Sequence, residues 1–522
     1  MITQNLLDSI TRNSTENVYL IDKKKYVVNL VFLNPDGSSL QISKNNVRNL
    51  NINDNILLPH DMSSISFIDN DNVFQRLKAD NKDIEFNPEF KNILKGYNFR
   101  GDGRDFLYIE ILPVDKENEI FGVNDQEYNK LFGYRNVFIC TDSDEYIENG
   151  NTIKTYNLMD FDEKILKERK SYFSSSSLVE SDKPTFLLSN KEREVETGKC
   201  IKNLLRESLL LKANEEIVDT IDGETPDFED GSSKIFYTSP ANNTSYEDLL
   251  FLYDKHVSNS TKNDFSILKK DKFTNRYSLK SVNELFDKAY NKKDNTAGKL
   301  NLEKILISGS SDEESSIQNS TKSPTQLITF GEYSQVRQVK FFNTDSLINS
   351  NKLVTKALHS YNFEDKQFNL DKQDSDISKV RDFYTEDYVQ NMKGESDLPF
   401  PNFVVNNTKN LNLSFTNDYS LYGENDIIRR GEGLNKLLKH AIFTNIAAEI
   451  QLKGQLFRKT GTFLSLDRAG RYVDNLFDSK FLGIYFIIDV NHSFINDTTY
   501  NNTVLAVKTY IYDDPKFRED IL

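Results

Sequence analysis

The segment from Asn445 to Lys453 alternates between two kinds of side chain, and this alternation constrains the fold more than any other sequence feature. Its apolar set is Ile446, Ala448, Ile450 and Leu452, and the other set is Ala447, Glu449, Gln451 and Lys453. Successive side chains of a β-strand point to opposite faces of a sheet, so a period of two places the apolar set on one face. Gly454 ends the pattern. The segment predicts a half-buried strand of an antiparallel sheet.

The rest of the C-terminal region extends this prediction to a compact antiparallel unit. Gly461–Leu466, Gly483–His492 and Thr503–Tyr512 are rich in β-branched and aromatic residues and predict three more strands. Gly433–Thr444 precedes them with apolar residues at helical spacing and predicts an amphipathic helix.

A second β-rich region lies at the other end of the chain. The strands predicted there are Tyr26–Leu33, Ser39–Ser43, Phe106–Leu112, Asn136–Thr141 and Thr152–Leu158. Asn34–Gly37 supplies Pro and Gly for a tight turn between the first two. Gly101, Asp102 and Gly103 lie in another turn before Phe106. The region predicts an antiparallel barrel or sandwich.

The middle of the chain changes to a helical period. Helices are predicted at Asp160–Lys170, Thr197–Lys212, Ser245–His256 and Ser278–Tyr290, with Ser174–Ser177 as a short linker. Residues 291–326 and 371–400 are polar and have little to bury, which predicts excursions or segments that order on assembly.

Composition narrows the range of functions. The net charge is −15, from 65 basic and 80 acidic residues, which argues against tight nucleic-acid binding and suits a channel wall along which DNA slides. The two cysteines, Cys140 and Cys200, are expected to be buried free thiols. The sequence contains neither a signal peptide nor a run of about 18 apolar residues, so we expect no membrane span and synthesis in a host cytoplasm.

Motifs for catalysis are missing from the sequence. It has no Walker A loop, HExxH or GxSxG, and its five histidines are scattered. Arg100-Gly101-Asp102 is interpreted as a hairpin turn, and Asp142–Glu145 lacks the Gly and final Glu of a calcium loop. We therefore expect no enzyme activity, no catalytic residues, no cofactor and no metal, although paired carboxylates of a glycoside hydrolase stay open as an alternative.

The order of the C-terminal elements resembles the hub proteins of contractile phage tails. The segments that carry the resemblance are Ala447–Gly454, Gly461–Leu466, Gly483–His492, Tyr500 and Thr503–Lys508. Phe99–Asp105 and Ser245–Tyr290 are similar to other parts of that family in a weaker way, and the resemblance touches about half of the chain.

The resemblance implies an α+β fold, mainly antiparallel β, with two tube-type β-barrels and helical and irregular insertions. It also implies a homotrimer whose six barrels form a pseudo-sixfold ring that joins the hexameric tail tube to the threefold central spike. The expected partners are further copies of the chain, the tail tube protein, the central spike protein and other baseplate (wedge) proteins. DNA would pass through the lumen only transiently, and the location would be the virion, in the tail baseplate.

The resemblance and the predicted elements together give expected domain boundaries and contact residues. Residues 1–170 would form the first barrel, and 171–335 a helical and mixed region partly contributing to the second. Residues 336–430 would be a mixed insertion, and 431–522 the C-terminal helix and strands of the second barrel. Ring contacts between subunits, through edge-to-edge strand pairing, are expected at Ile446, Ala448, Ile450, Leu452, Leu505, Val507 and Thr509. His492 is expected to close a strand end with a hydrogen bond rather than to perform chemistry.

Three alternatives remain at this point. One is another tail-tube or baseplate component of the same barrel family, which would be hexameric rather than trimeric if it belonged to the tube. Another is a tail-associated cell-wall hydrolase. A toxin or surface adhesin is the third, and the missing secretion signal counts against it.

Overall fold

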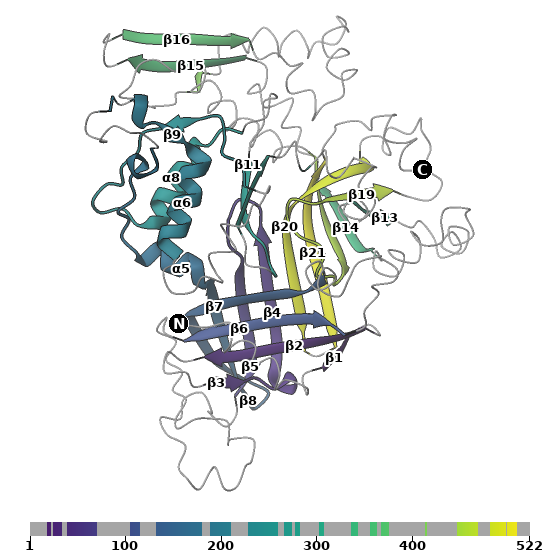
Figure 1. Cartoon of the computed structure of the whole chain (residues 1–522). Helices are drawn as coiled ribbons and strands as arrows, with labels where there is room; N and C mark the ends of the chain where they lie inside the picture. The colour runs from purple at the N-terminus through teal and green to yellow at the C-terminus, as the bar shows by residue number, and fades with distance from the viewer. Residues whose placement is uncertain are drawn as a thin grey trace, which may run out of the picture.

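A computed structural model gives the fold of the chain (Figure 1). It describes residues 18–21, 24–33, 39–69, 105–114, 132–179, 188–189, 191–209, 228–258, 266–273, 277–281, 285, 302–306, 336–342, 355–362, 367–374, 413–414, 446–467, 481–496 and 498–508. The predicted turn residues Gly101, Asp102 and Gly103, the predicted contact Thr509 and the predicted helix Gly433–Thr444 lie outside these ranges.

One sheet of 14 strands dominates the described residues, and its strands come from both ends of the chain. The N-terminal β-unit consists of β1 (Val18–Ile21), β2 (Lys24–Leu33), β3 (Ser39–Gln41), β4 (Val47–Asn55), β5 (Met62–Ile68), β6 (Phe106–Pro113), β7 (Tyr134–Glu148) and β8 (Asn151–Asp160). The C-terminal β-unit consists of β13 (Leu302–Leu306), β14 (Val336–Phe342), β18 (Ala447–Lys453), β19 (Phe463–Asp467), β20 (Gly483–Ile495) and β21 (Thr499–Lys508). The main path through the sheet runs β1-β2-β6-β7-β8-β5-β4-β20-β21-β18-β14.

The two β-units meet where β4 pairs with β20. The pairing is antiparallel and continues from Asn55 opposite Asp489 to Asn49 opposite Ile495. Asn53 and Asn55 both donate side-chain hydrogen bonds to Asp489, at 3.1 and 2.8 Å. Figure 1 shows the result, with purple N-terminal strands lying beside yellow C-terminal strands. The prediction of a mainly antiparallel β fold built from both chain ends is confirmed.

Each β-unit has its own hydrophobic core. The N-terminal core is rich in aromatic rings, such as Phe67 stacked on Tyr156 at 5.4 Å between centroids. Aromatic side chains bury much apolar area each, which compensates for the low aliphatic content. The C-terminal core contains Ala448, Ile450 and Leu452, so the alternation that predicted this strand is confirmed by its burial.

The C-terminal β-unit also contributes to the N-terminal core. Phe494 and Tyr500, stacked at 3.9 Å between centroids, belong to that core. Tyr500 lies over the backbone of Gly454, whose N–H donates to the Tyr500 carbonyl at 2.8 Å. A Cβ at position 454 would overlap the ring of Tyr500.

Gly454→Ala is therefore expected to destabilise the protein by about 1–3 kcal/mol, the usual cost of overpacking a core. Urea-induced unfolding measures the change. If the overlap is the cause, Gly454→Ala combined with Tyr500→Ala should cost less than the sum of the two single changes. Additive costs would contradict this explanation.

A helical unit lies beside the sheet. It contains α5 (Phe161–Glu168), α6 (Thr197–Leu209) and α8 (Ser245–Lys255), with the short pairs β9–β10 (Val195–Glu196, Lys234–Ile235) and β11–β12 (Ser266–Lys270, Tyr277–Ser281). These three predicted helices are confirmed. Thr244 and Glu247 form a capping box at the start of α8. The predicted linker Ser174–Ser177 instead overlaps a 3-10 turn, Ser175–Leu178, in which Ser175 is buried.

The helix predicted over Ser278–Tyr290 is wrong for its first residues. Tyr277–Ser281 is strand β12 and pairs with β11. Its burial alternates with a period of two, since Tyr277, Leu279 and Ser281 are buried and the residues between them are half-buried. In the rest of the predicted range, 282–290, the structure describes only Leu285, so the helix prediction is tested over Ser278–Ser281 alone.

Two segments predicted as insertions supply strands to the main sheet. Strand β13 lies inside the predicted excursion 291–326 and pairs in parallel with β19, with Ile305 fully buried. Strand β14 lies in the predicted insertion 336–430 and pairs with β18. The same stretch supplies β15 (Thr355–Asn362), β16 (Gln367–Asp374) and β17 (Leu413–Ser414), which form a separate sheet. The predicted domain boundaries stay predictions. Within the described ranges, no helix has the length and hydropathy to cross a bilayer.

Candidate functional site

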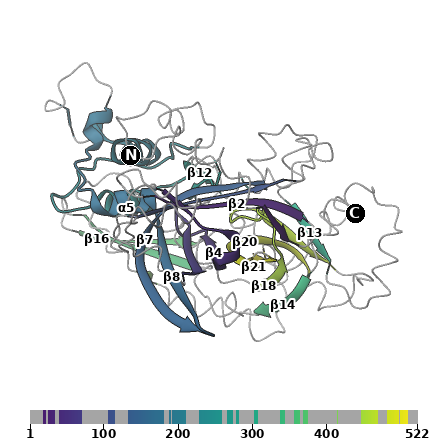
Figure 2. The same ribbon diagram turned by 90° about the horizontal axis from the view of Figure 1, so that it is seen from below.

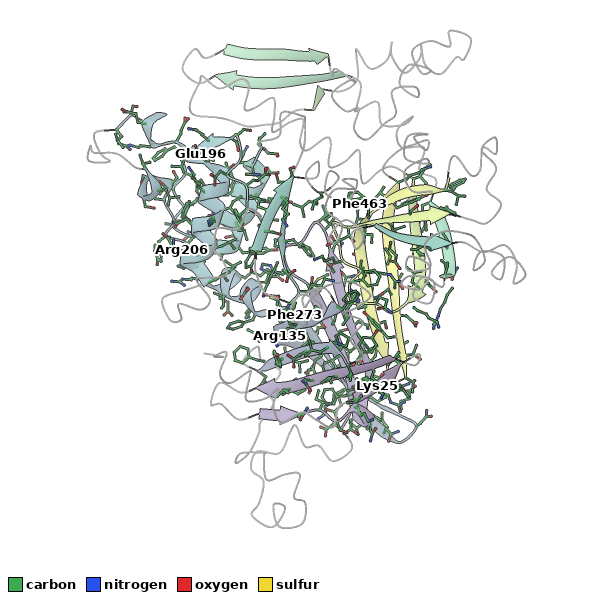
Figure 3. All side chains as sticks on the ribbon, turned by 45° about the vertical axis from the view of Figure 1, so that its right-hand side comes forward. Lys25, Arg135, Glu196, Arg206, Phe273 and Phe463 are labelled. Carbon is green, nitrogen blue, oxygen red and sulfur yellow. The ribbon has the colours of Figure 1, made fainter. Side chains whose placement is uncertain are left out.

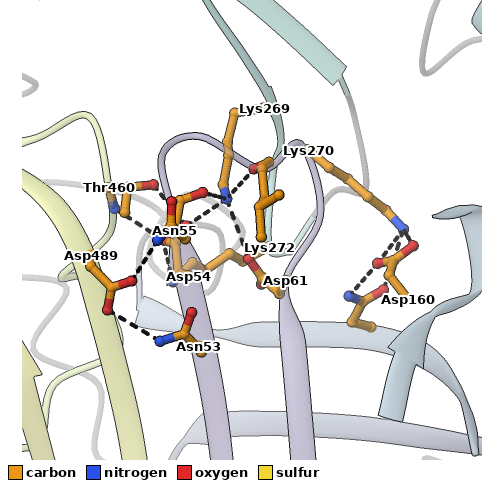
Figure 4. Close-up of polar contacts among 12 residues, drawn as sticks. Asn53, Asp54, Asn55, Asp61, Asp160, Lys269, Lys270, Lys272, Thr460 and Asp489 are labelled. Atoms are coloured by element: carbon orange, nitrogen blue, oxygen red, sulfur yellow. Dashed lines mark hydrogen bonds and ion pairs between the residues drawn. The ribbon is translucent and has the colours of Figure 1, made fainter. Parts of the chain in front are cut away.

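A group of ionic side chains, buried except for the half-buried Lys269, lies where the N-terminal β-unit, the C-terminal β-unit and the helical unit meet (Figure 4). We define the ionic junction as Asp54, Asp61, Asp160, Lys269, Lys270 and Lys272. The aspartates belong to the N-terminal β-unit, and the lysines come from β11 and the turn that follows it. Thr460 and His492 of the C-terminal part bond directly to members of the junction. Buried charges are stable only when they are paired and hydrogen-bonded, so these contacts fix the three parts relative to each other.

Asp54 is the centre of the junction. It is fully buried, and its Oδ1 and Oδ2 lie 2.7 Å from Lys269 Nζ and 2.8 Å from Lys272 Nζ. Thr460 donates to the same carboxylate from its backbone N–H, at 2.9 Å, and from its hydroxyl, at 2.7 Å. Burial acts to raise the pKa of Asp54, but the two lysine charges outweigh it and hold the pKa well below its usual value. The carboxylate is therefore charged at neutral pH and links all three parts of the chain.

Lys270 makes the second ion pair of the junction. Its Nζ lies 3.0 Å from Asp160 and 2.7 Å from Asp162, at the start of α5. Asn136 donates to Asp160 at 2.7 Å. Burial acts to lower the pKa of Lys270, but the two carboxylates raise it above its usual value. The pair joins β11 to the end of β8 and the first turn of α5.

The turn after β11 also lies against β7. The backbone N–H of Arg135 donates to the carbonyl of Lys272 at 2.8 Å. The Arg135 guanidinium lies over the ring of Phe273, 5.0 Å from its centroid, and Figure 3 labels both residues at this contact. Such a cation–π contact adds to the ion pairs on the same turn.

His492 lies inside strand β20 rather than at its end, because the strand continues to Ile495. Its Nε2 lies 3.2 Å from Lys272 Nζ, and its Nδ1 lies 2.7 Å from the Tyr500 hydroxyl. Burial and the nearby Lys272 charge lower its pKa well below the usual value. A neutral imidazole can accept a hydrogen bond from Lys272, so His492 connects the junction to the C-terminal β-unit.

Asp61 is the member of the junction whose charge is unfavourable. Its Oδ1 lies 3.6 Å from Lys269 Nζ, and the Tyr134 hydroxyl donates to its Oδ2 at 3.4 Å. Burial and repulsion from Asp54 raise its pKa from 3.8 to about 6, against the attraction of Lys269. Between about pH 4 and pH 6 the native state therefore binds more protons at this site than the unfolded state, and stability falls as the pH rises.

Asp61→Asn removes this unfavourable charge. We expect it to stabilise the protein at pH 7 by at most about 3 kcal/mol, from about 1.4 kcal/mol per unit of pKa shift. The gain should shrink as the pH falls from about 6 to about 3, where the wild-type carboxyl is protonated in the native state and mostly protonated in the unfolded state. Unfolding by urea at several pH values checks this. A variant that is less stable than the wild type at pH 7 would contradict it.

A further buried ion pair holds β13 to the rest of the C-terminal β-unit. Arg458, which is 1% exposed, donates two hydrogen bonds to the Glu303 carboxylate, at 2.8 and 2.7 Å. It also donates to Asn502 Oδ1 at 2.8 Å and to the carbonyl of Lys453. This forked geometry is specific to arginine.

The helical unit contains a Thr–His–Glu arrangement that superficially matches a nucleophile, a base and an orienting acid. Thr197 Oγ1 lies 2.9 Å from His256 Nδ1, and His256 Nε2 lies 3.1 Å from Glu229 Oε1. Thr197 is 1% exposed, and its hydroxyl also bonds to Ser233 at 2.7 Å. A nucleophile has to reach its substrate, so this closed arrangement serves to hold residues 229–233 against α6.

The described residues contain no cluster of three or more His, Cys, Asp or Glu side chains placed to bind a metal ion. The two cysteines, Cys140 and Cys200, are buried free thiols as predicted.

Most of the predicted ring contacts on and beside β18 and β21 are buried within the chain. Those that are buried are Ile446, Ala448, Ile450, Leu452 and Val507, and Leu505 is half-buried. Strand β18 is bonded to β14 and β21, and β21 is bonded to β18 and β20. Their backbone edges are thus used within the chain, and the predicted edge-to-edge pairing with another subunit is not open to them. Contact between subunits through the outward side chains of these strands stays a prediction.

No protein-family model matches the chain, and no curated protein matches it either. Among solved structures, the tail protein from Neisseria meningitidis MC58 is similar with 7% identity and a TM-score of 0.44, over 92% of this chain and 99% of that one. The 43 kDa tail protein of prophage MuSo2 from Shewanella oneidensis has 9% identity and a TM-score of 0.43, over 92% and 98%.

The Francisella PdpA-VgrG complex contains a chain with 12% identity and a TM-score of 0.41, over 98% of this chain and 56% of that one. The sequence identities and TM-scores are low, so these similarities carry no argument about the function of this chain.

Proposed function

We propose that this chain is the structural hub of a contractile phage tail baseplate. Three copies would form a pseudo-sixfold ring that joins the hexameric tail tube to the threefold central spike and surrounds the DNA channel. The observation that carries the proposal is the pairing of β4 with β20, which holds two β-units, each with its own core, side by side in one chain. Closure of each unit into a tube-type barrel is part of the proposal.

The geometry suits a symmetry adaptor. Two β-units per chain and three chains give six units, which can face a sixfold tube on one side and a threefold spike on the other. Each chain in such a ring has to keep its two β-units in a fixed relation under mechanical load. The β4–β20 pairing and the ionic junction both support this, because separating the two β-units would remove Thr460 from the buried carboxylate of Asp54 and His492 from Lys272.

The charge of the chain supports a lumen that does not retain DNA. Its net charge of −15 repels a polyanion, and an acidic wall would let DNA pass without counterion release. The outward faces of β18 and β21, with Glu449 and Leu505, are the proposed positions of ring contacts on this unit. The tail tube, the spike and the wedge proteins are the proposed partners.

Native mass spectrometry of the purified full chain tests the proposal. We expect a trimer, and negative-stain images should show a ring with a central hole. A hexamer would favour a tail-tube component instead, and a monomer at every concentration would contradict both. Labelling of the protein in intact tails should place it at the junction of tube and spike. Zymography on peptidoglycan should give no clearing, and a cleared zone would favour the hydrolase alternative.

A further inference from the structure

Strand β7 continues far beyond the neighbour on its outer side. It pairs with β6 only as far as Ile139 opposite Phe106, but with β8 as far as Glu148 opposite Asn151. A bulge between Cys140 and Asp142 marks the change. All eight residues from Thr141 to Glu148 are exposed. Figure 2 shows β7 and β8 as a long curved hairpin that leaves the body of the molecule. We call Thr141–Glu148 the acidic edge.

The acidic edge has a sequence that favours pairing with a cationic strand. It contains Asp142, Asp144, Glu145 and Glu148 and no basic residue. Glu145 lies 3.9 Å from Lys154 of the adjoining strand, and the other three have no ion-pair partner among the described residues. Ile147 and Tyr146 are 77% and 48% exposed. A strand with one open backbone edge and exposed apolar side chains is a template for another strand, and its charges decide which strands it accepts.

The end of the main sheet path carries the opposite charge. Strand β14 is bonded to β18 on one side, and no described strand lies on its other side. Its sequence, VRQVKFF, contains Arg337 and Lys340 and no acidic residue. Both cations are exposed, and neither has a carboxylate partner among the described residues. We call Val336–Phe342 the basic edge.

We propose that the acidic edge of one copy of this chain pairs with the basic edge of a second copy. The inference rests on the ring proposed above and names the strands that would form it. The two edges have similar lengths, eight and seven residues, and their charges are complementary. A chain with a net charge of −15 repels its own copies, so a local patch of opposite sign favours association at that patch. Different edges meet in this contact, so it is head-to-tail and closes a ring when the rotation permits.

Strands β18, β21 and β1 are less suited to pairing with a second copy of the chain. Both edges of β18 and β21 are bonded within the chain. Strand β1 ends the sheet path on the other side, but it has four residues and no charged side chain. Along the main sheet path of the described residues, the acidic and basic edges combine length, an open side and opposite charge.

A charge exchange between the two edges tests the proposal in the full chain. Arg337→Glu with Lys340→Glu makes both edges acidic, and Asp142→Lys with Asp144→Lys weakens the acidic edge. We expect each double variant to associate at least about tenfold more weakly than the wild type, measured by analytical ultracentrifugation at low salt. The variant with all four changes should regain part of the lost association, because it again places two lysines on one edge and two glutamates on the other.

The control variant is Lys170→Glu with Arg206→Glu, at exposed cations of the helical unit. It changes the net charge by the same amount as Arg337→Glu with Lys340→Glu. It should associate like the wild type, and thermal unfolding should show that all variants fold. Trimers that form equally well in both edge variants would overturn the proposed edges while leaving the hub intact. Loss in both edge variants without recovery in the fourfold variant would also overturn the pairing. A wild-type chain that stays monomeric would overturn both proposals.

Discussion

Asp54→Asn is expected to lower the free energy of unfolding by about 3–5 kcal/mol, the usual cost of removing one partner from a buried ion pair. The change keeps the shape of the side chain but leaves Lys269 and Lys272 without the carboxylate that both contact, at 2.7 and 2.8 Å. It also presents an amide donor to the Thr460 donors. Chemical unfolding followed by circular dichroism at neutral pH measures the loss.

Asp230→Asn is the matched control, because Asp230 is an exposed aspartate that lies outside both the ionic junction and the acidic edge. Its effect on stability should stay within about 0.5 kcal/mol. Equal effects of the two substitutions would mean that the junction does not stabilise the fold.

Arg458→Met should cost a similar amount, about 3–5 kcal/mol, because it removes the bidentate cationic partner of the buried Glu303 carboxylate. Glu303 is 2% exposed, and Arg458 is its bidentate partner. Arg458 also bonds to Asn502 and to the carbonyl of Lys453, so its loss affects three segments of the C-terminal β-unit.

Replacing both partners separates the cost of the unpaired charge from the cost of lost packing. Arg458→Met with Glu303→Met should recover much of the stability lost in the single variant, because well-packed apolar pairs often replace buried ion pairs without loss. A double variant that is less stable than Arg458→Met would contradict this and would indicate that the remaining bonds of Arg458 dominate.

The strands at both chain ends were predictable because their local pattern matches their environment. Residues 446–453 alternate in sequence and in burial, since one face meets a core and the other does not. The helices α5, α6 and α8 were predictable for the same reason, at the helical period. Ser278–Ser281 was assigned to a helix because Leu279 starts a set of apolar residues at helical spacing, yet the pairing of this segment with β11 decides the structure.

The ionic junction could not be predicted from local sequence. Lys269, Lys270 and Lys272 form a charged run, and such a run is normally interpreted as a solvated turn. Their partners are far away along the chain, with 110 residues between Lys270 and Asp160 and 220 between Lys272 and His492. Only the tertiary fold brings these groups together, and no spacing rule connects them. Strands β13 and β14 were missed because charged residues interrupt each of these short segments and polar sequence surrounds them.

The pairing of β4 with β20 has a consequence for how the chain is made. Asn53 contacts Asp489, 436 positions later, and Phe494 and Tyr500 complete the core formed by the first strands. During synthesis, the early strands therefore emerge from the ribosome long before the residues that seal them. Closing so long a loop is slow and leaves apolar surface uncovered for most of translation. We expect chains truncated before β20 to bind chaperones or to aggregate, so the last strands control the maturation of the first.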